Sequence, residues 1–341
     1  MDLLITLFIF FVLLCCIVYK AKIYPDTNPN FFDVENTNAL RGLWSIIVIM
    51  VHIPAAYGNI IQDAAGSFAN VGVTFFFMLS GYGLTASLQH RGALQKNFWK
   101  RRLLKLLIPQ LLLNIASVLL FHLLFGDKIQ FLSIVWISRW LTWLLVCYLI
   151  FWSMHKLIPD FKWANAAIAI LIVAFSVAQY CLKYFGVIEA TIWSTEIYGF
   201  LWGIILAAFY PQIKHLANRH WLLKTVLICI AAILMGITYL KYKTIVFWGD
   251  YLLRIALACV IIIFLLLLNM RISVGNRALR LLGSISFELY LSHTAVINAI
   301  ERGIPAARSG LFILMVLIGA SIMSAFVHAI SAYVFRKINL R

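Results

Sequence analysis

Apolar segments of about twenty residues recur from one end of this 341-residue chain to the other. A bilayer has a hydrocarbon core about 30 Å thick, and a helix that rises 1.5 Å per residue needs about twenty apolar residues to cross it. Charged residues make up only 12% of the chain, whereas soluble domains contain about 25%. These features predict an all-α, polytopic membrane protein built as a bundle of transmembrane helices.

The pattern of apolar segments predicts about eleven spans, at 3–19, 39–61, 68–88, 103–125, 134–156, 164–182, 193–211, 221–240, 250–270, 281–300 and 309–335. A polar, proline-containing linker follows the first of them. We therefore expect two parts: an N-terminal accessory helix with a cytoplasmic linker at 1–38, and a core of about ten helices at 39–341.

Basic residues are unevenly divided between alternate loops, and the densest cluster is Lys100, Arg101, Arg102 and Lys105. The positive-inside rule puts that cluster in the cytoplasm. The parity of the predicted spans then places the N-terminus outside and the C-terminus inside. Because the basic residues lie in short loops between spans, this rule also accounts for the net charge of +16. We therefore expect no nucleic-acid partner.

The segment 36–58, NTNALRGLWSIIVIMVHIPAAYG, carries Arg41 near one end and His52 well inside its apolar part. At 100° per residue the two side chains lie within about 20° of one helical face, about 16 Å apart along the axis. Pro54 leaves the carbonyl of Met50 without its helical donor and favours a kink. Since ionisable groups in a membrane usually mark function, we expect His52 to line a water-accessible cavity.

Each of these features also has a plainer structural interpretation. His52 would then only hydrogen-bond a neighbouring helix, and Arg41 would extend to the lipid headgroups. The glycines in NVGVTFFFMLSGYGLT, at 70–85, would allow close contact between helices. The basic cluster in NFWKRRLLKLLIPQ, at 97–110, suits anionic lipid headgroups as well as a phosphate-bearing soluble ligand.

A third stretch, LGSISFELYLSHTAV at 282–296, places Tyr290 and His293 on one helical face. Together with the two stretches above and the Arg41-x10-His52 pattern, it resembles the acyltransferase-3 family of integral membrane acyltransferases. YGFLWGIILA, at 198–207, is similar to a further family segment. The order and spacing agree over about residues 36 to 300. One difference is Lys105, which stands where the family has a second arginine, and lysine lacks the planar fork for bidentate binding.

The resemblance implies transfer of an acyl group, most often acetyl, from cytoplasmic acyl-CoA to a hydroxyl of a cell-envelope carbohydrate. It also implies a location in the cell membrane, and the bacterial cytoplasmic membrane in particular. His52 would act as the general base or as a covalent acyl-histidine relay, and Arg41 would orient the donor. The resemblance further implies that the basic cluster binds coenzyme A. It also implies that Tyr290 and His293 bind the acceptor.

Two other classes of function fit parts of the sequence. A transporter or flippase for a lipid-linked saccharide would also combine many spans with an ionisable residue at the membrane centre. A structural or regulatory membrane protein would keep the fold without activity. We expect no metal site, because the eight histidines are scattered and none has the spacing of a ligand pair.

Overall fold

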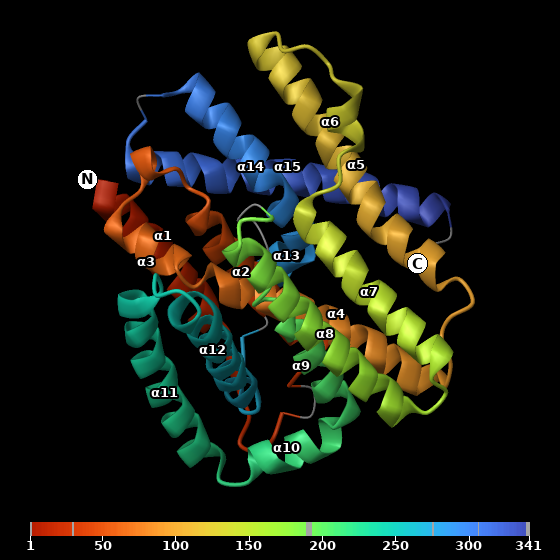
Figure 1. Cartoon of the computed structure of the whole chain (residues 1–341). Coiled ribbons are helices and arrows are strands. Elements are labelled where there is room, and N and C mark those ends of the chain that lie inside the picture. Colours follow the sequence, from red (N-terminus) through yellow and green to blue (C-terminus); the bar gives the residue numbers. More distant parts are fainter. Residues whose placement is uncertain (1, 29–30, 189–192, 275, 306, 339–341) are drawn as a thin grey trace.

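The computed structural model describes residues 2–28, 31–188, 193–274, 276–305 and 307–338 (Figure 1). About 80% of the chain is helical. The α-helices are α1 (Asp2–Val18), α2 (Val34–Val51), α3 (Ile60–Gly66), α4 (Ala69–Arg91), α5 (Phe98–Phe125), α6 (Phe131–Val135), α7 (Arg139–Leu157), α8 (Phe161–Tyr184), α9 (Tyr198–Ala208), α10 (Tyr210–Asn218), α11 (Trp221–Tyr242), α12 (Arg254–Asn269), α13 (Arg277–Ser284), α14 (Ser286–Gly303) and α15 (Ser309–Lys337). A 3-10 turn, η1 (Ala55–Tyr57), precedes α3, and a π-helical segment, η2 (Trp248–Leu253), leads into α12.

Seven helical segments of the described chain are long and apolar enough to cross a membrane. They are Ile60–Arg91, Phe98–Phe125, Arg139–Leu157, Phe161–Tyr184, Trp221–Tyr242, Trp248–Asn269 and Ser309–Lys337. Two shorter apolar helices, Leu3–Val18 and Tyr198–Ala208, add to them. The predicted helical membrane fold is confirmed, while the count of eleven spans and the orientation stay predictions.

The predicted span at 39–61 is not one helix. Helix α2 ends at Val51, and His52 is its C-terminal cap. Pro54 then begins an extended turn, because proline offers no N–H to continue the ladder. The side-chain amide of Gln62 on α3 donates to the carbonyl of Met50, the group to which a proline at position 54 cannot donate. The proline therefore ends the helix rather than kinking it, and His52 lies at a helix end.

Glycines allow a very close helix contact between α4 and α9. A Cβ added to Gly203 would lie 2.0 Å from the carbonyl oxygen of Met78, and one on Gly199 would lie 2.0 Å from that of Thr74. Gly81 meets the backbone of Phe200 equally closely. No side chain fits between backbones at such distances. The expectation that glycines in the stretch 70–85 allow close contact between helices is therefore confirmed for Gly81. Gly83, in contrast, faces open space.

A short antiparallel ribbon is the one departure from an all-α fold within the described residues. Lys22–Ile23 (β1) pairs with Ile272–Ser273 (β2), so the predicted linker is fixed to the segment before α13. Residues 29–30 of that linker lie outside the described residues. Helix α1 packs against α15 (Figure 1). The proposed division at residue 38 stays a prediction.

Candidate active site

Two cavities approach each other inside the bundle. The first, which we call the basic cavity, has a volume of about 370 Å³, and its ionisable lining residues include Arg41, Arg102, Lys105, Glu288 and His328. The second, the histidine cavity, has a volume of about 510 Å³, and its polar lining includes His52, Asp63, Asn70, Glu196, Lys243 and Arg254. Tyr290 lines both. Arg41 and His52 were expected on one helical face, but their side chains line different cavities.

The basic cavity gathers three cations from two helices. Arg41 comes from α2, and Arg102 and Lys105 come from one face of α5. The guanidinium of Arg102 lies 5.9 Å from the ring centre of Tyr148, which restrains it by a cation–π contact. Lys100 and Arg101 belong to the same basic segment but are not among the residues lining the cavity. This arrangement suits an anionic ligand such as a phosphate-bearing cofactor.

An ion pair that the sequence analysis missed also lines the basic cavity. Nδ1 of His328 on α15 lies 2.9 Å from Oε1 of Glu288 on α14, whose side chain is 5% exposed. Glu288 therefore has a histidine partner, but from another helix and not from the nearby His293. The available signal was a histidine inside the apolar run at 309–335, the same type of signal that singled out His52.

His52 is held in one tautomer by its own helix. Its Nδ1 lies 2.8 Å from the carbonyl oxygen of Val48. A carbonyl only accepts, so Nδ1 carries the hydrogen and Nε2 of the neutral ring is left as a free acceptor. The ring is exposed and lines the histidine cavity. A neutral imidazole in this state can take a proton from a ligand in that cavity.

A row of rings separates the two cavities. The centre of the His293 ring lies 4.5 Å from that of His52, and the Tyr290 ring follows 5.8 Å from His293. The centre of the Tyr290 ring also lies 4.8 Å from that of Trp140 and 6.2 Å from that of Phe76. The structure thus brings Tyr290 and His293 beside His52, and Tyr290 forms the partition between the cavities.

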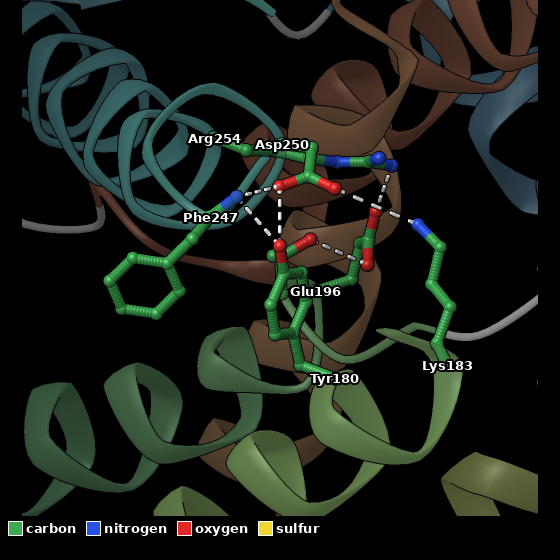
Figure 2. A network of polar contacts seen from close by, with 7 residues as sticks. Tyr180, Lys183, Glu196, Phe247, Asp250 and Arg254 are labelled. Atoms are coloured by element: carbon green, nitrogen blue, oxygen red, sulfur yellow. Dashed lines mark hydrogen bonds and ion pairs between the residues drawn. The ribbon is translucent and has the colours of Figure 1, made fainter. Parts of the chain in front are cut away.

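A second pair, with a buried carboxylate, forms part of the wall of the histidine cavity. Glu196 follows the segment outside the described residues and binds Arg254, the first residue of α12 (Figure 2). Next to it, Asp250 accepts from the hydroxyl of Tyr180 at 2.8 Å and lies 3.8 Å from Nζ of Lys183. Glu196 and Arg254 were missed, although both are ionisable residues inside predicted spans, at 193–211 and 250–270.

No cluster of three or more histidine, cysteine, aspartate or glutamate side chains suited to a metal ion occurs among the residues that the structure describes. Two of the carboxylates in the cavities, Glu288 and Glu196, are instead paired with a basic side chain. Each cavity combines one carboxylate–cation pair with at least one nitrogen base or cation facing the open space. Such an arrangement supports proton transfer and electrostatic binding.

Comparison with known proteins identifies the family. The model of the acyltransferase-3 family, described as an acyltransferase domain, matches residues 34–333. The match includes every lining residue of the histidine cavity and all those of the basic cavity except Phe335, and it leaves out α1. No curated protein and no solved structure matches the chain significantly. The match covers nearly the whole chain, so this membrane protein belongs to the acyltransferase-3 family.

Proposed function

We propose that the chain transfers an acyl group, most often acetyl, from acyl-CoA to a hydroxyl of a cell-envelope carbohydrate, in the bacterial cytoplasmic membrane. Membership of the family makes it a membrane acyltransferase. The observation that carries the rest is the state of His52. Its Nδ1–H is engaged by Val48, so Nε2 is available as a base in a polar cavity large enough for a sugar ring.

The basic cavity is the proposed donor site. Coenzyme A carries several phosphate charges, and Arg41, Arg102 and Lys105 supply three cations in one cavity. Lys100 and Arg101 lie in the same segment as Arg102 and Lys105 and add to the positive potential there. Arg41 would orient the pantetheine arm toward Tyr290, since both residues line this cavity. The predicted orientation puts this cavity on the cytoplasmic side, where acyl-CoA is made.

The proposed chemistry takes place at the partition between the cavities. Nε2 of His52 takes the proton of the acceptor hydroxyl while the oxygen attacks the thioester carbonyl. The C–S bond then breaks, and the leaving thiolate receives the proton from the imidazolium. A relay is the second route: Nε2 attacks the thioester carbonyl, and the C–S bond breaks to release the coenzyme A thiolate. The acceptor oxygen then attacks the acyl-histidine, the C–N bond to Nε2 breaks, and the hydroxyl proton passes to the thiolate. Tyr290 and His293 would orient the acceptor in either route.

The rival function, transport of a lipid-linked saccharide, gains one supporting observation. Two cavities that share the lining residue Tyr290 are also compatible with alternating access. The chemistry separates the two functions, because transport releases no thiol from acetyl-CoA.

The test uses the purified chain in detergent with acetyl-CoA and a panel of glycan acceptors. We expect thiol release that depends on acceptor and is accompanied by an added acetyl mass on the glycan. His52→Ala is the control and should release none. Thiol release that is equal in this variant and the wild type would overturn the proposed role of His52. Loss of ester groups from envelope glycans in a deletion strain would identify the natural acceptor.

A further inference from the structure

The Glu196–Arg254 pair has no part in the proton transfer proposed above, yet it lies in the wall of the cavity that holds His52. Removing two charges from water costs several kcal/mol per ion. A buried ion pair is therefore weak evidence for stability, and inside a membrane it usually marks a function.

The hydrogen bonds of Glu196 show which partner faces the cavity. One carboxylate oxygen binds Nη2 of Arg254, and the other accepts from the hydroxyl of Thr195 at 2.9 Å (Figure 2). The Glu196 side chain is 2% exposed, so both of its oxygens are used within the protein. The Arg254 side chain is 35% exposed, and its Nε is buried without a hydrogen-bond partner. Glu196 thus positions Arg254, and Arg254 keeps an unused donor.

An unused acceptor lies in the same wall. Asn70 on α4 is 5% exposed, and its Nδ2 donates to the backbone carbonyl of Arg254 at 3.4 Å. Its Oδ1 is buried and has no partner among the described residues. Buried polar atoms in native proteins are nearly always paired, and each exception needs an explanation. A bound ligand with hydroxyl groups would pair both the Asn70 oxygen and the Arg254 nitrogen.

The charges around this cavity limit the ligand class. Two carboxylates, Asp63 and Glu196, face two cations, Lys243 and Arg254, and Nζ of Lys243 donates to Ser67 at 2.8 Å. The full charges cancel, unlike those of the basic cavity. An anionic ligand would therefore meet no net attraction here. A neutral polyol, which both donates and accepts hydrogen bonds, matches the lining.

We propose that Asn70 and Arg254, the latter held by Glu196, form the binding wall for an uncharged sugar unit of the acceptor. This inference rests on the proposed function. It adds that the site selects neutral sugars over uronates and sugar phosphates, and that Glu196 is a positioning residue that sets this selectivity.

Binding is measured without turnover, by calorimetry on a His52→Ala background. The probes are a neutral N-acetylglucosamine trisaccharide and an anionic galacturonate trisaccharide. We expect the parent to bind the neutral probe more tightly. Asn70→Ala should weaken that binding about 5- to 20-fold, since a buried group loses its hydrogen bond. Gln179→Ala is the matched control: Gln179 is also buried with an unpartnered amide, but it does not line the cavity.

Glu196→Gln tests selectivity separately from stability. It removes one negative charge and leaves Arg254 unneutralised, so the preference should shift toward the galacturonate probe. A merely structural role would weaken both probes alike and would overturn the positioning role. Arg254→Gln should weaken neutral binding as Asn70→Ala does. If that variant does not fold because Glu196 loses its partner, Asn70→Ala alone decides the question.

Other outcomes separate this inference from the proposed function. Equal binding of the neutral probe by the parent and Asn70→Ala, or tighter binding of galacturonate by the parent, would overturn the inference and leave acyl transfer untouched. Sugar binding with no thiol release from acetyl-CoA by the wild type would support the binding wall and overturn the proposed function.

Discussion

The two cavities that meet at Tyr290 differ most in their charge. The basic cavity places Arg41, Arg102 and Lys105 around one open space, where the single carboxylate is Glu288. In the histidine cavity cations and carboxylates are equal in number. Coulomb interactions favour an anion in the first and give it no net gain in the second. This difference in charge suits a highly charged donor on one side of Tyr290 and a neutral acceptor on the other.

The cavities also differ in their backbone. Long helices provide most of the basic cavity, including α4, α5, α14 and α15. Helix ends provide much of the histidine cavity: the cap at His52, the short α3, the segment before α9 and the start of α12. Helix ends leave backbone groups without intrahelical partners, and water or a polar ligand satisfies them. The histidine cavity is thus the one built for a hydrated, polar substrate.

The largest expected effect separates the two histidines that face open space. His52→Ala should lower kcat about 10³-fold, the scale of a lost general base, without changing the affinity for coenzyme A. His328→Ala, the matched variant in the basic cavity, should lower kcat far less. Steady-state thiol release measures kcat, and calorimetry measures coenzyme A binding. The reverse result, with His328→Ala inactive and His52→Ala active, would put the base in the basic cavity.

Removing the partition is the next test. Tyr290→Ala takes away the ring that lines both cavities. Part of the acetyl-CoA should then be hydrolysed instead of donating its acyl group, and transfer should fall about 10- to 100-fold. The variant should also lose about 3–5 kcal/mol of stability, as large aromatic deletions do. Tyr290→Phe keeps the ring and should keep acetyl-CoA turnover coupled to transfer. Coupled turnover in Tyr290→Ala would mean that the ring is not the partition.

Two neighbouring arginines sharpen the comparison on the donor side. Arg102 lines the basic cavity and Arg101 does not. Arg102→Ala should raise the KM for acetyl-CoA about 10-fold, with a smaller change in kcat, because charged hydrogen bonds to phosphate contribute about 1.5–3 kcal/mol. Arg101→Ala should raise this KM about 2-fold at most. Equal effects of the two substitutions would mean that the donor binds along the segment and not in the cavity.

The smallest effect concerns an ion pair whose two residues line neither cavity. Arg302 on α14 donates to Asp127 at 2.6 Å, and this hydrogen bond lowers the pKa of Asp127. A lowered pKa stabilises the fold above the ordinary pKa of aspartate, and that contribution is lost as the pH falls through the folded value. Asp127→Asn should therefore change Tm by about 1–2 °C at most at neutral pH. Its Tm difference from the wild type should shrink in acid, and acyl transfer should not change.

Much of the local structure could be predicted from particular residues. Pro54 indicated an interruption of the helix near His52, but the expected interruption was a kink. The helix ends there instead, and the side chain of Gln62 donates to the carbonyl of Met50. The glycine-rich stretch indicated close packing, which Gly81 confirms. The helix period placed Arg41 and His52 on one face, but it could not show that neighbouring helices put a partition between them.

Four further residues of the two cavities form two pairs that the sequence could not predict, because the partners are distant in sequence. Glu288 and His328 lie forty residues apart and meet only when α14 packs on α15. Glu196 and Arg254 lie 58 residues apart. A period or a spacing reports neighbours on one helix, whereas these pairs depend on how separate helices cross.

By itself, the sequence determined that this chain is a helical membrane protein with the motifs of an acyltransferase, because apolar length and local spacing are properties of single segments. Only the tertiary structure decided that its ionisable residues form two cavities of unlike charge with Tyr290 between them. Charges in a membrane must find partners or a polar space. Which partners they find is fixed by the contacts between helices, and no single segment contains that information.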